Sequence, residues 1–418
     1  MFNTIRNAWR IPDLRKKMIF TLLMLFVFRL GSFIPVPGMN REALASLIES
    51  GGLLSFLDVI SGGAFKNFAI FAMNISPYIT ASIIMNLLTI AIPSLEALAK
   101  EGEEGRKKIA QYTRYGTVIL ALIQAIALSI GLKSYLLKSD FVSVALVALS
   151  LTAGTAFLMW LGELMTEKGV GNGISLIIFA GIVSRIPVGA MNLFNLYKVK
   201  SVSIIELIGF LLVSILIIMG VVLIQEGQRR IPVQYAKRVV GRKMYGGQSS
   251  HIPLKINQAG VIPVIFAMSI IEFPKQIAGF FPNSGAYNFF NKYFAWGTGL
   301  HGVIYALLII GFTYFYTAVS FNPVEVANNI KKYGGFIPGI RPGRPTVEFI
   351  QRSLSRITLV GALFLAFIAI LPIFLMTFTN IKIYFGSTSL LIVVSVAMET
   401  VQQIEAQMIM RNYQGFLN

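Results

Sequence analysis

The sequence predicts an all-α polytopic membrane protein with ten transmembrane helices. Apolar residues make up 55% of the 418 residues, whereas charged residues make up only 13%, which is too little polar surface for an ordinary soluble domain. The apolar residues also gather in runs of about 20, the length that crosses a hydrocarbon core. These runs cover residues 18–36, 68–92, 115–133, 141–161, 174–194, 203–225, 259–281, 302–321, 357–378 and 383–404.

The first apolar run, Met18 to Val36, follows a basic stretch from Arg6 to Lys17. It is longer than the core of a signal peptide and has no clear small-residue cleavage site. We therefore expect it to be retained as the first span, with Arg29 inside it.

A shorter apolar segment, LLSFLDVISGGAF, lies between the first and second runs and ends at Gly62 and Gly63. A helix of about a dozen residues is roughly 18 Å long and cannot cross a core of about 30 Å. The segment therefore either enters the membrane without crossing it or lies on its surface. The pattern alone does not separate a re-entrant segment from an interfacial helix.

The net charge of +18 is explained by membrane orientation without a nucleic-acid partner. An even number of spans places both termini on one side. If that side is the cytoplasm, most of the 36 Lys and Arg residues fall in cytoplasmic segments, as the positive-inside rule requires.

Two cytoplasmic loops, residues 226–257 and 322–356, are unusually long and basic. Their Gly- and Pro-rich stretches favour turns and extended segments, so we expect ordered protrusions. Ten spans also divide into two five-helix halves, residues 1–195 and 196–418, as in inverted-repeat membrane folds. No residue-level repeat supports this symmetry, which remains a conjecture.

Most catalytic chemistry lacks the residues that it needs. The chain has no cysteine, and we expect His251 and His301 to be ordinary loop residues rather than metal ligands. No GxxxxGK[ST] or HExxH motif occurs, and the spans hold no plausible acid–base constellation. We therefore expect a protein that is not an enzyme and needs no cofactor or metal.

Several motifs together are very specific in their order and spacing. They include GSFIPVPG, SGGAF, SPYITASII, EGRKKIAQYTRYGT, GVGNGISLIIFAGIV, GQRRIPVQYAKR, HIPLKINQAGVIP, FNPVEVANNIKK and GGFIPGIRPG. With these motifs the chain resembles the SecY family in its bacterial form, over some nine-tenths of its length. The resemblance implies a channel for unfolded secretory polypeptides in the bacterial plasma membrane, with two pseudo-symmetric halves around a central pore.

The resemblance also implies the parts of the pore. A ring of apolar side chains would consist of Ile75, Ile79, Ile174, Ile178, Ile265 and Ile392. The short segment about 53–64 would be a re-entrant plug, with Leu53, Leu54, Phe56, Leu57, Val59, Ile60, Gly62 and Gly63. Without the resemblance, a membrane isoleucine more often packs against a neighbouring helix or faces lipid.

A lateral gate between the second and seventh spans is implied at Pro77, Thr80, Asn257 and Phe273. Pro77 and Pro263 lie within the two predicted gate spans, where a proline loosens a helix, although prolines are common in spans generally. Three positions depart from the family pattern: Asn74, Ser76 and Glu272. We expect Glu272, near the outer end of its span, to snorkel or to be paired.

The family's receptor surface corresponds to Arg229, Arg230, Lys237, Arg238 and Arg341. A guanidinium pairs bidentately with ribosomal RNA phosphates and with the carboxylates of the SecA motor protein. The alternative is that the loop charges only orient the protein. The resemblance implies SecE, SecG, SecA, the ribosome, signal peptides, unfolded preproteins and membrane lipid as partners.

Two other functions remain open from the residues alone. A secondary transporter also has many spans and helix breaks, but it places polar ligands near the midplane, where this chain offers chiefly isoleucines. A membrane scaffold would show no conducting state when the plug segment is deleted.

Overall fold

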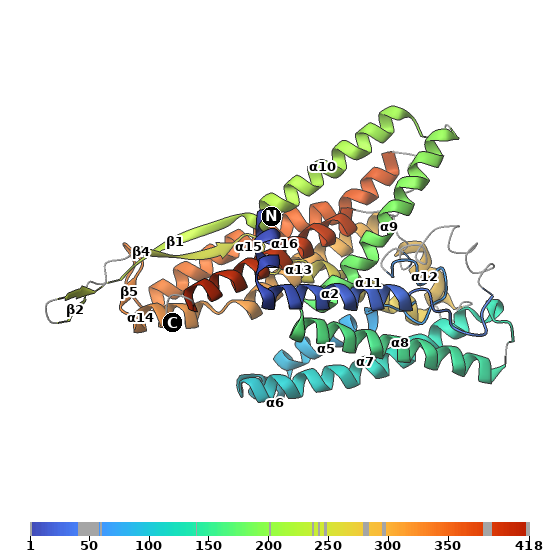
Figure 1. Cartoon of the computed structure of the whole chain (residues 1–418), viewed down its shortest axis with the longest axis horizontal. Helices are drawn as coiled ribbons and strands as arrows, with labels where there is room; N and C mark the ends of the chain where they lie inside the picture. The colour runs from blue at the N-terminus through green and yellow to red at the C-terminus, as the bar shows by residue number, and fades with distance from the viewer. Residues whose placement is uncertain are drawn as a thin grey trace.

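The computed structural model describes residues 2–40, 58, 61–138, 140–199, 202–235, 238–240, 243–245, 249–278, 284–294, 298–378 and 387–414. Within these residues, each of the ten predicted spans overlaps a helix (Figure 1). These helices are α2 (Pro12–Gly31), α5 (Ser76–Ala91), α7 (Glu103–Gly131), α8 (Phe141–Lys168), α9 (Gly173–Lys198), α10 (Ile204–Glu226), α11 (Ile262–Ala278), α13 (Gly299–Ser320), α15 (Arg344–Phe378) and α16 (Ser387–Gln414). The predicted all-α membrane fold is confirmed.

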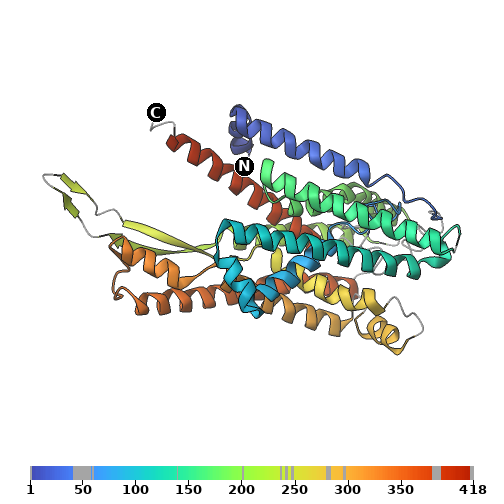
Figure 2. The same cartoon turned by 90° about the horizontal axis from the view of Figure 1, so that it is seen from below.

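Length and composition qualify most of these helices as spans by themselves. Seven described helices are long and apolar enough to cross a membrane, and an eighth candidate is the pair of α5 and α6 (Pro93–Lys100), bent by 99° at Ile92. The bend is visible in Figure 2. Helix α11 has only 17 residues, and α2 begins with several basic residues, so these two fall short of the same criteria.

Side-chain caps explain where several helices begin. Asn172 accepts hydrogen bonds from the backbone N–H groups of Ile174 and Ser175 at the start of α9. Ser203 and Glu206 form a capping box at the start of α10. These bonds satisfy N–H groups that have no partner inside the helix. These caps set the residues at which α9 and α10 begin.

The second predicted span, 68–92, is helical only from Ser76, and its first part is not a helix. Phe68 and Asn74 have φ angles of 42° and 51°, in the left-handed region that a helix excludes. The N–H of Ile70 donates to Ile34 at 2.9 Å, and the Phe68 carbonyl accepts from Val36 at 2.9 Å. Non-helical backbone is tolerated at membrane depth when protein covers it, and most of 61–75 is buried.

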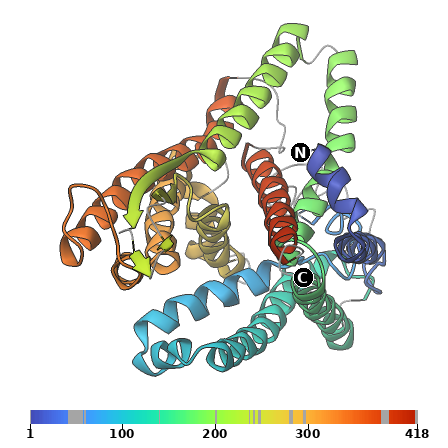
Figure 3. The ribbon, with the colours of Figure 1, turned by 60° about the vertical axis from the view of Figure 1, so that its left-hand side comes forward.

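Residues of this segment belong to two different apolar clusters. Ala64, Ala69, Phe71 and Ile75 belong to the large central cluster, which joins α2, α8, α9, α10, α11, α13, α15 and α16. Phe65, Phe68 and Ala72 instead pack with the outer ends of α7 and α8. Helix α16 lies between α15 and α2 near the middle of the molecule (Figure 3). Segment 61–75 therefore connects the central core with the first half's own core.

The long loops fold into one protrusion, as the sequence predicts. Strand β1 (Gln228–Tyr235) pairs antiparallel with β4 (Ser249–Lys255) and with β5 (Gly335–Phe336), giving the order β4-β1-β5. A second hairpin of β2 (Arg238–Val240) and β3 (Lys243–Tyr245) lies at the tip. The sheet packs on α14 (Pro323–Lys332) and the start of α15 through a core of its own. The protrusion extends from the end of the bundle where both termini lie (Figures 1 and 2).

The remaining short helices lie at the edges of the bundle. Helix α1 (Phe2–Arg10) contacts α16, where Thr4 donates to Glu405 at 3.0 Å. A 3-10 turn, η1 (Lys133–Tyr135), follows α7, and α12 (Gly285–Tyr293) follows α11. The loop end of the α9–α10 hairpin leans away from the other helices (Figures 1 and 3).

Candidate functional site

The six isoleucines of the predicted ring come together in one apolar cluster. Ile75, Ile178 and Ile392 are 1%, 4% and 3% exposed, and they belong to the central cluster. Ile79, Ile174 and Ile265 are partly buried and pack against it. Four helices supply these side chains: α5 with the residue before it, α9, α11 and α16. The cluster therefore draws on both predicted halves, and the role of its isoleucines as a pore ring stays a prediction.

The end of the predicted plug is held against α2 and α9. Gly62 and Gly63 have φ angles of 66° and 92°, which glycine adopts at little cost. A Cβ at Gly62 would lie 2.9 Å from the Cα of Gly181, so only glycine allows this approach to α9. Leu53, Leu54, Phe56, Leu57, Val59 and Ile60 lie outside the described residues.

The two predicted gate helices, α5 and α11, are in contact. Thr80 is 8% exposed, and its hydroxyl donates to the Ser76 carbonyl at 3.1 Å. Phe273 is half-buried in α11. Asn257 is 4% exposed and donates to Gln225 of α10 and to the Gly260 carbonyl, each at 3.0 Å. Its described hydrogen bonds thus join α10 to the segment before α11.

The prediction that prolines loosen the gate helices internally at Pro77 and Pro263 is wrong. Pro77 lies in the first turn of α5, and Pro263 is the second residue of α11. In a first turn the N–H that proline lacks has no helical partner in any case, so proline starts the helix rather than kinking it. The proline inside α11 is Pro274.

Two departures from the family pattern now have a structural context. Asn74 adopts a φ of 51°, and asparagine after glycine is the residue that tolerates this conformation best. Glu272 is 6% exposed, and its carboxylate lies 3.2 Å from the Lys275 ammonium, so the expected pairing is confirmed. Ser76 is the first residue of α5.

The prediction that both histidines are loop residues is also wrong. His251 is exposed in β4, and His301 is 2% exposed in the first turn of α13, where it lines one small pocket with Glu272 and Tyr305. His251 falls in the predicted loop 226–257, and His301 immediately precedes the predicted span 302–321, so neither was assigned to a helix or a strand. Among the described residues, no three His, Asp or Glu side chains gather as metal ligands would.

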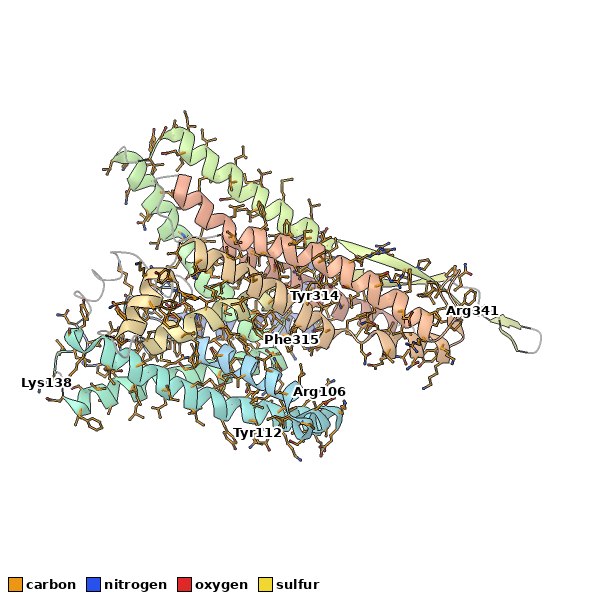
Figure 4. All side chains as sticks on the ribbon, turned by 180° about the vertical axis from the view of Figure 1, so that it is seen from behind. Arg106, Tyr112, Lys138, Tyr314, Phe315 and Arg341 are labelled. Atoms are coloured by element: carbon orange, nitrogen blue, oxygen red, sulfur yellow. The ribbon has the colours of Figure 1, made fainter. Side chains whose placement is uncertain are left out.

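The predicted receptor residues lie on the protrusion. Arg229 and Arg230 are exposed on β1, and Arg238 is in β2, whereas Lys237 lies outside the described residues. Arg341 is exposed in the turn between β5 and α15. Figure 4 shows Arg341 at the end of the molecule beside the hairpin, with Lys138 at the opposite end. The basic side chains therefore share one end of the protein.

A buried threonine holds the turn that carries Arg341. The hydroxyl of Thr346, which is 2% exposed, donates to the Arg341 carbonyl at 2.9 Å. We expect Thr346→Val to weaken binding of a cytoplasmic partner several-fold while changing global stability by about 1 kcal/mol or less, since one hydrogen bond is lost at constant shape. Partner affinity and unfolding temperature measure the two effects.

Thr313→Val is the matched control for that substitution. Thr313 is 1% exposed, and its hydroxyl donates at 2.7 Å to Ile309 within its own helix, away from the protrusion. We expect no change in partner affinity for the control. Equal losses in both variants would contradict a specific role for the turn.

Sequence reasoning missed a set of charged residues around the plug hinge. Arg29 donates to the Gly62 carbonyl at 2.5 Å, and Arg185 forms an ion pair with Asp58. The signal was present, because an ionisable residue inside an apolar run is a candidate functional residue, and both arginines lie inside predicted spans. What the sequence does not give is the contact between residues so far apart.

Comparison with known proteins gives the family. The SecY family matches residues 69–401 of the chain. This chain belongs to the SecY family. A relative, the protein translocase subunit SecY of Halalkalibacterium halodurans, is 53% identical over 431 residues, which is 100% of both chains.

Two solved structures share the SecY fold. One is a SecY protein whose plug domain is described as stabilising the closed state of the translocation channel and maintaining a membrane seal. It has a TM-score of 0.69 and 21% identity, covering 94% of this chain and 92% of its own. The other is Sec61 in a canine ribosome-channel complex from the endoplasmic reticulum, with a TM-score of 0.65 and 18% identity, covering 94% and 93%.

Proposed function

We propose that this chain is the channel subunit of a bacterial protein translocase. Unfolded secretory polypeptides pass through the isoleucine ring, and membrane-protein segments leave sideways into lipid between α5 and α11. One observation carries the proposal: three of the six isoleucines lie in the central apolar cluster and the other three pack against it, and four helices of both predicted halves supply them. Membership of the SecY family and the name of the relative support it.

An apolar ring suits a channel for chains of any sequence. A narrow apolar constriction dewets and so blocks ions, and it offers a passing chain no hydrogen bond that would retain it. A secondary transporter instead needs polar ligands for substrate and coupling ion near the midplane. The six predicted ring positions offer only aliphatic side chains, which favours the channel.

The positions of α5, α11 and the Gly62–Gly63 pair support the proposed gate and plug. Contact between α5 and α11 supports a closed seam that can part sideways. The Gly62–Gly63 pair, with both φ angles positive, supports a hinge at which the segment 53–64 swings away from the pore. The plug moves when a polypeptide enters from the cytoplasmic side.

Energy for movement comes from partners. The exposed basic residues of the protrusion suit SecA carboxylates or ribosomal RNA phosphates, and the ribosome-bound Sec61 neighbour shares the fold. SecE and SecG brace the two halves, because a clamp that opens sideways needs support from outside. The protein lies in the bacterial plasma membrane with both termini in the cytoplasm, and it carries out no chemistry itself.

Disulfide crosslinking tests the pore directly, because the chain has no cysteine of its own. A cysteine is introduced at Ile79 or Ile265, and another in a secretory substrate stalled during transport with SecA and SecE. We expect adducts at both ring positions, since a chain in the pore must pass within bonding distance of the ring.

Ile205 provides the lipid-facing control, being 78% exposed on α10. It should give no adduct. Crosslinking at Ile205 with none at the ring would overturn the pore assignment and reopen the transporter and scaffold alternatives.

A further inference from the structure

We propose that Arg29 and Arg185 are positioning residues that hold the plug hinge closed, through Gly62 and Asp58. This proposal rests on the proposed function, because it assigns the closed state of that channel to particular side chains. The four residues are called the hinge clamp below. They lie in separate parts of the chain, on α2, on α9 and in the segment between them.

The first contact of the hinge clamp is to backbone. The Arg29 guanidinium donates to the Gly62 carbonyl at 2.5 Å and to the Ser184 hydroxyl at 3.2 Å. Ser184 donates in turn to the Gly181 carbonyl at 2.8 Å. A charged donor makes a stronger hydrogen bond than a neutral one. Arg29 of α2 and Ser184 of α9 therefore hold the Gly62 carbonyl in place together.

The second contact is a charge pair. Asp58 and Arg185 form an ion pair in which the two side chains are 8% and 16% exposed. The other Asp58 oxygen accepts from the Lys66 N–H at 2.6 Å, and the Asp58 carbonyl accepts from the Gly63 N–H at 2.9 Å. Asp58 thus closes the turn internally while its charge binds α9.

The turn packs closely against α9, with little space for a side chain at Gly62 or Gly63. A Cβ at Gly63 would lie 3.0 Å from the Arg185 guanidinium, and a Cβ at Gly62 would lie 2.8 Å from the Ser184 hydroxyl. The paired glycines let the turn rest directly on the polar atoms of α9. A shift of the hinge therefore breaks the carbonyl contact and the ion pair together.

Opening has an electrostatic consequence. Arg29 donates to Gly62, and the Arg185 guanidinium lies beside Gly63, so the two arginines contact adjacent residues of the hinge. Asp58, which belongs to the predicted plug segment, supplies the carboxylate that pairs with Arg185. When the plug leaves, Arg185 loses the counter-charge of Asp58 while Arg29 stays nearby, which disfavours the open state.

Ion flux through reconstituted channels without substrate tests the hinge clamp. Asp58→Asn and Arg185→Gln are each expected to raise the flux per folded channel about tenfold, because either change leaves a buried partner without its counter-charge. The double variant should leak no more than the worse single variant, since both remove the same interaction. Arg185→Lys keeps the charge and should restore most of the seal.

Arg114→Gln is the matched control. Arg114 pairs with Glu163 between α7 and α8 at 2.9 Å, so the substitution removes an arginine–carboxylate pair that is more exposed and lies away from the hinge. It should leave the flux unchanged. If Asp58→Asn and Arg185→Gln reduced the yield of folded protein but not the seal of each channel, the pair would be a folding element and the proposal would be overturned.

Preprotein transport in the same vesicles separates this proposal from the proposed function. If the wild-type protein transports preprotein and neither hinge variant leaks ions, the hinge clamp is refuted and the proposed function stands. A leak in the hinge variants without any preprotein transport by the wild type supports the hinge clamp and refutes the cargo assignment.

Discussion

Gly154→Ala is expected to destabilise the folded protein by about 3 kcal/mol or more, because overpacking against backbone cannot relax by a side-chain rotation. An added Cβ would lie 2.0 Å from the carbonyl oxygen of Ile70. Ile70 belongs to the buried non-helical segment 61–75, whose position is fixed by bonds to the chain after α2. Thermal unfolding of the purified protein in detergent measures the loss.

Gly209→Ala is the matched control for Gly154→Ala. Gly209 is also inside an apolar helix, but a Cβ there would meet no heavy atom within 4 Å. We expect a change of no more than about 1 kcal/mol, and in the stabilising direction, since alanine has the higher helix propensity. Equal destabilisation in the two variants would mean that helix flexibility, and not the contact with Ile70, requires the glycine.

Arg341→Glu is expected to lower partner-driven translocation about tenfold or more, because reversing a charge at a complementary interface turns attraction into repulsion. Arg341 is exposed at the end of the protrusion, and its turn is held by Thr346. Transport of a preprotein into proteoliposomes at limiting SecA measures the effect, which high SecA concentration should partly relieve.

Arg344→Glu controls for net charge. Arg344 is three residues away and equally exposed, but its guanidinium already pairs with Glu348 of the same helix at 3.2 Å. We expect less than about a twofold loss, since exposed pairs of this kind contribute little. Comparable losses in both variants would attribute the effect to the overall positive charge of the surface.

The helices were predictable because the bilayer leaves the backbone few alternatives. A lipid-exposed chain must satisfy its own N–H and C=O groups, so a run of apolar residues predicts a helix with little ambiguity. The same rule failed at 68–75, where protein and not lipid surrounds the chain. The residues of this part are as apolar as a helix, and nothing in them reveals the positive φ of Phe68.

The candidate site was predictable residue by residue but not contact by contact. Family motifs gave the six isoleucines, and the structure gathers them in one cluster. Asp58 and Arg185 were each visible as charges in apolar surroundings. They are far apart in the sequence of the predicted first half, and they meet only because α9 packs on the hinge. The pairing of Gln234 with Phe336 in the protrusion is equally long-range.

The three-stranded sheet connects the protrusion to four helices. Strand β1 continues directly from α10, β4 leads into α11, and β5 lies between α14 and α15. Because β1 is hydrogen-bonded to both other strands, a push on the tip is shared among these four helices instead of bending one loop. One of them, α11, is the helix that rests on α5. A displacement of the sheet is thereby passed to the contact between α11 and α5.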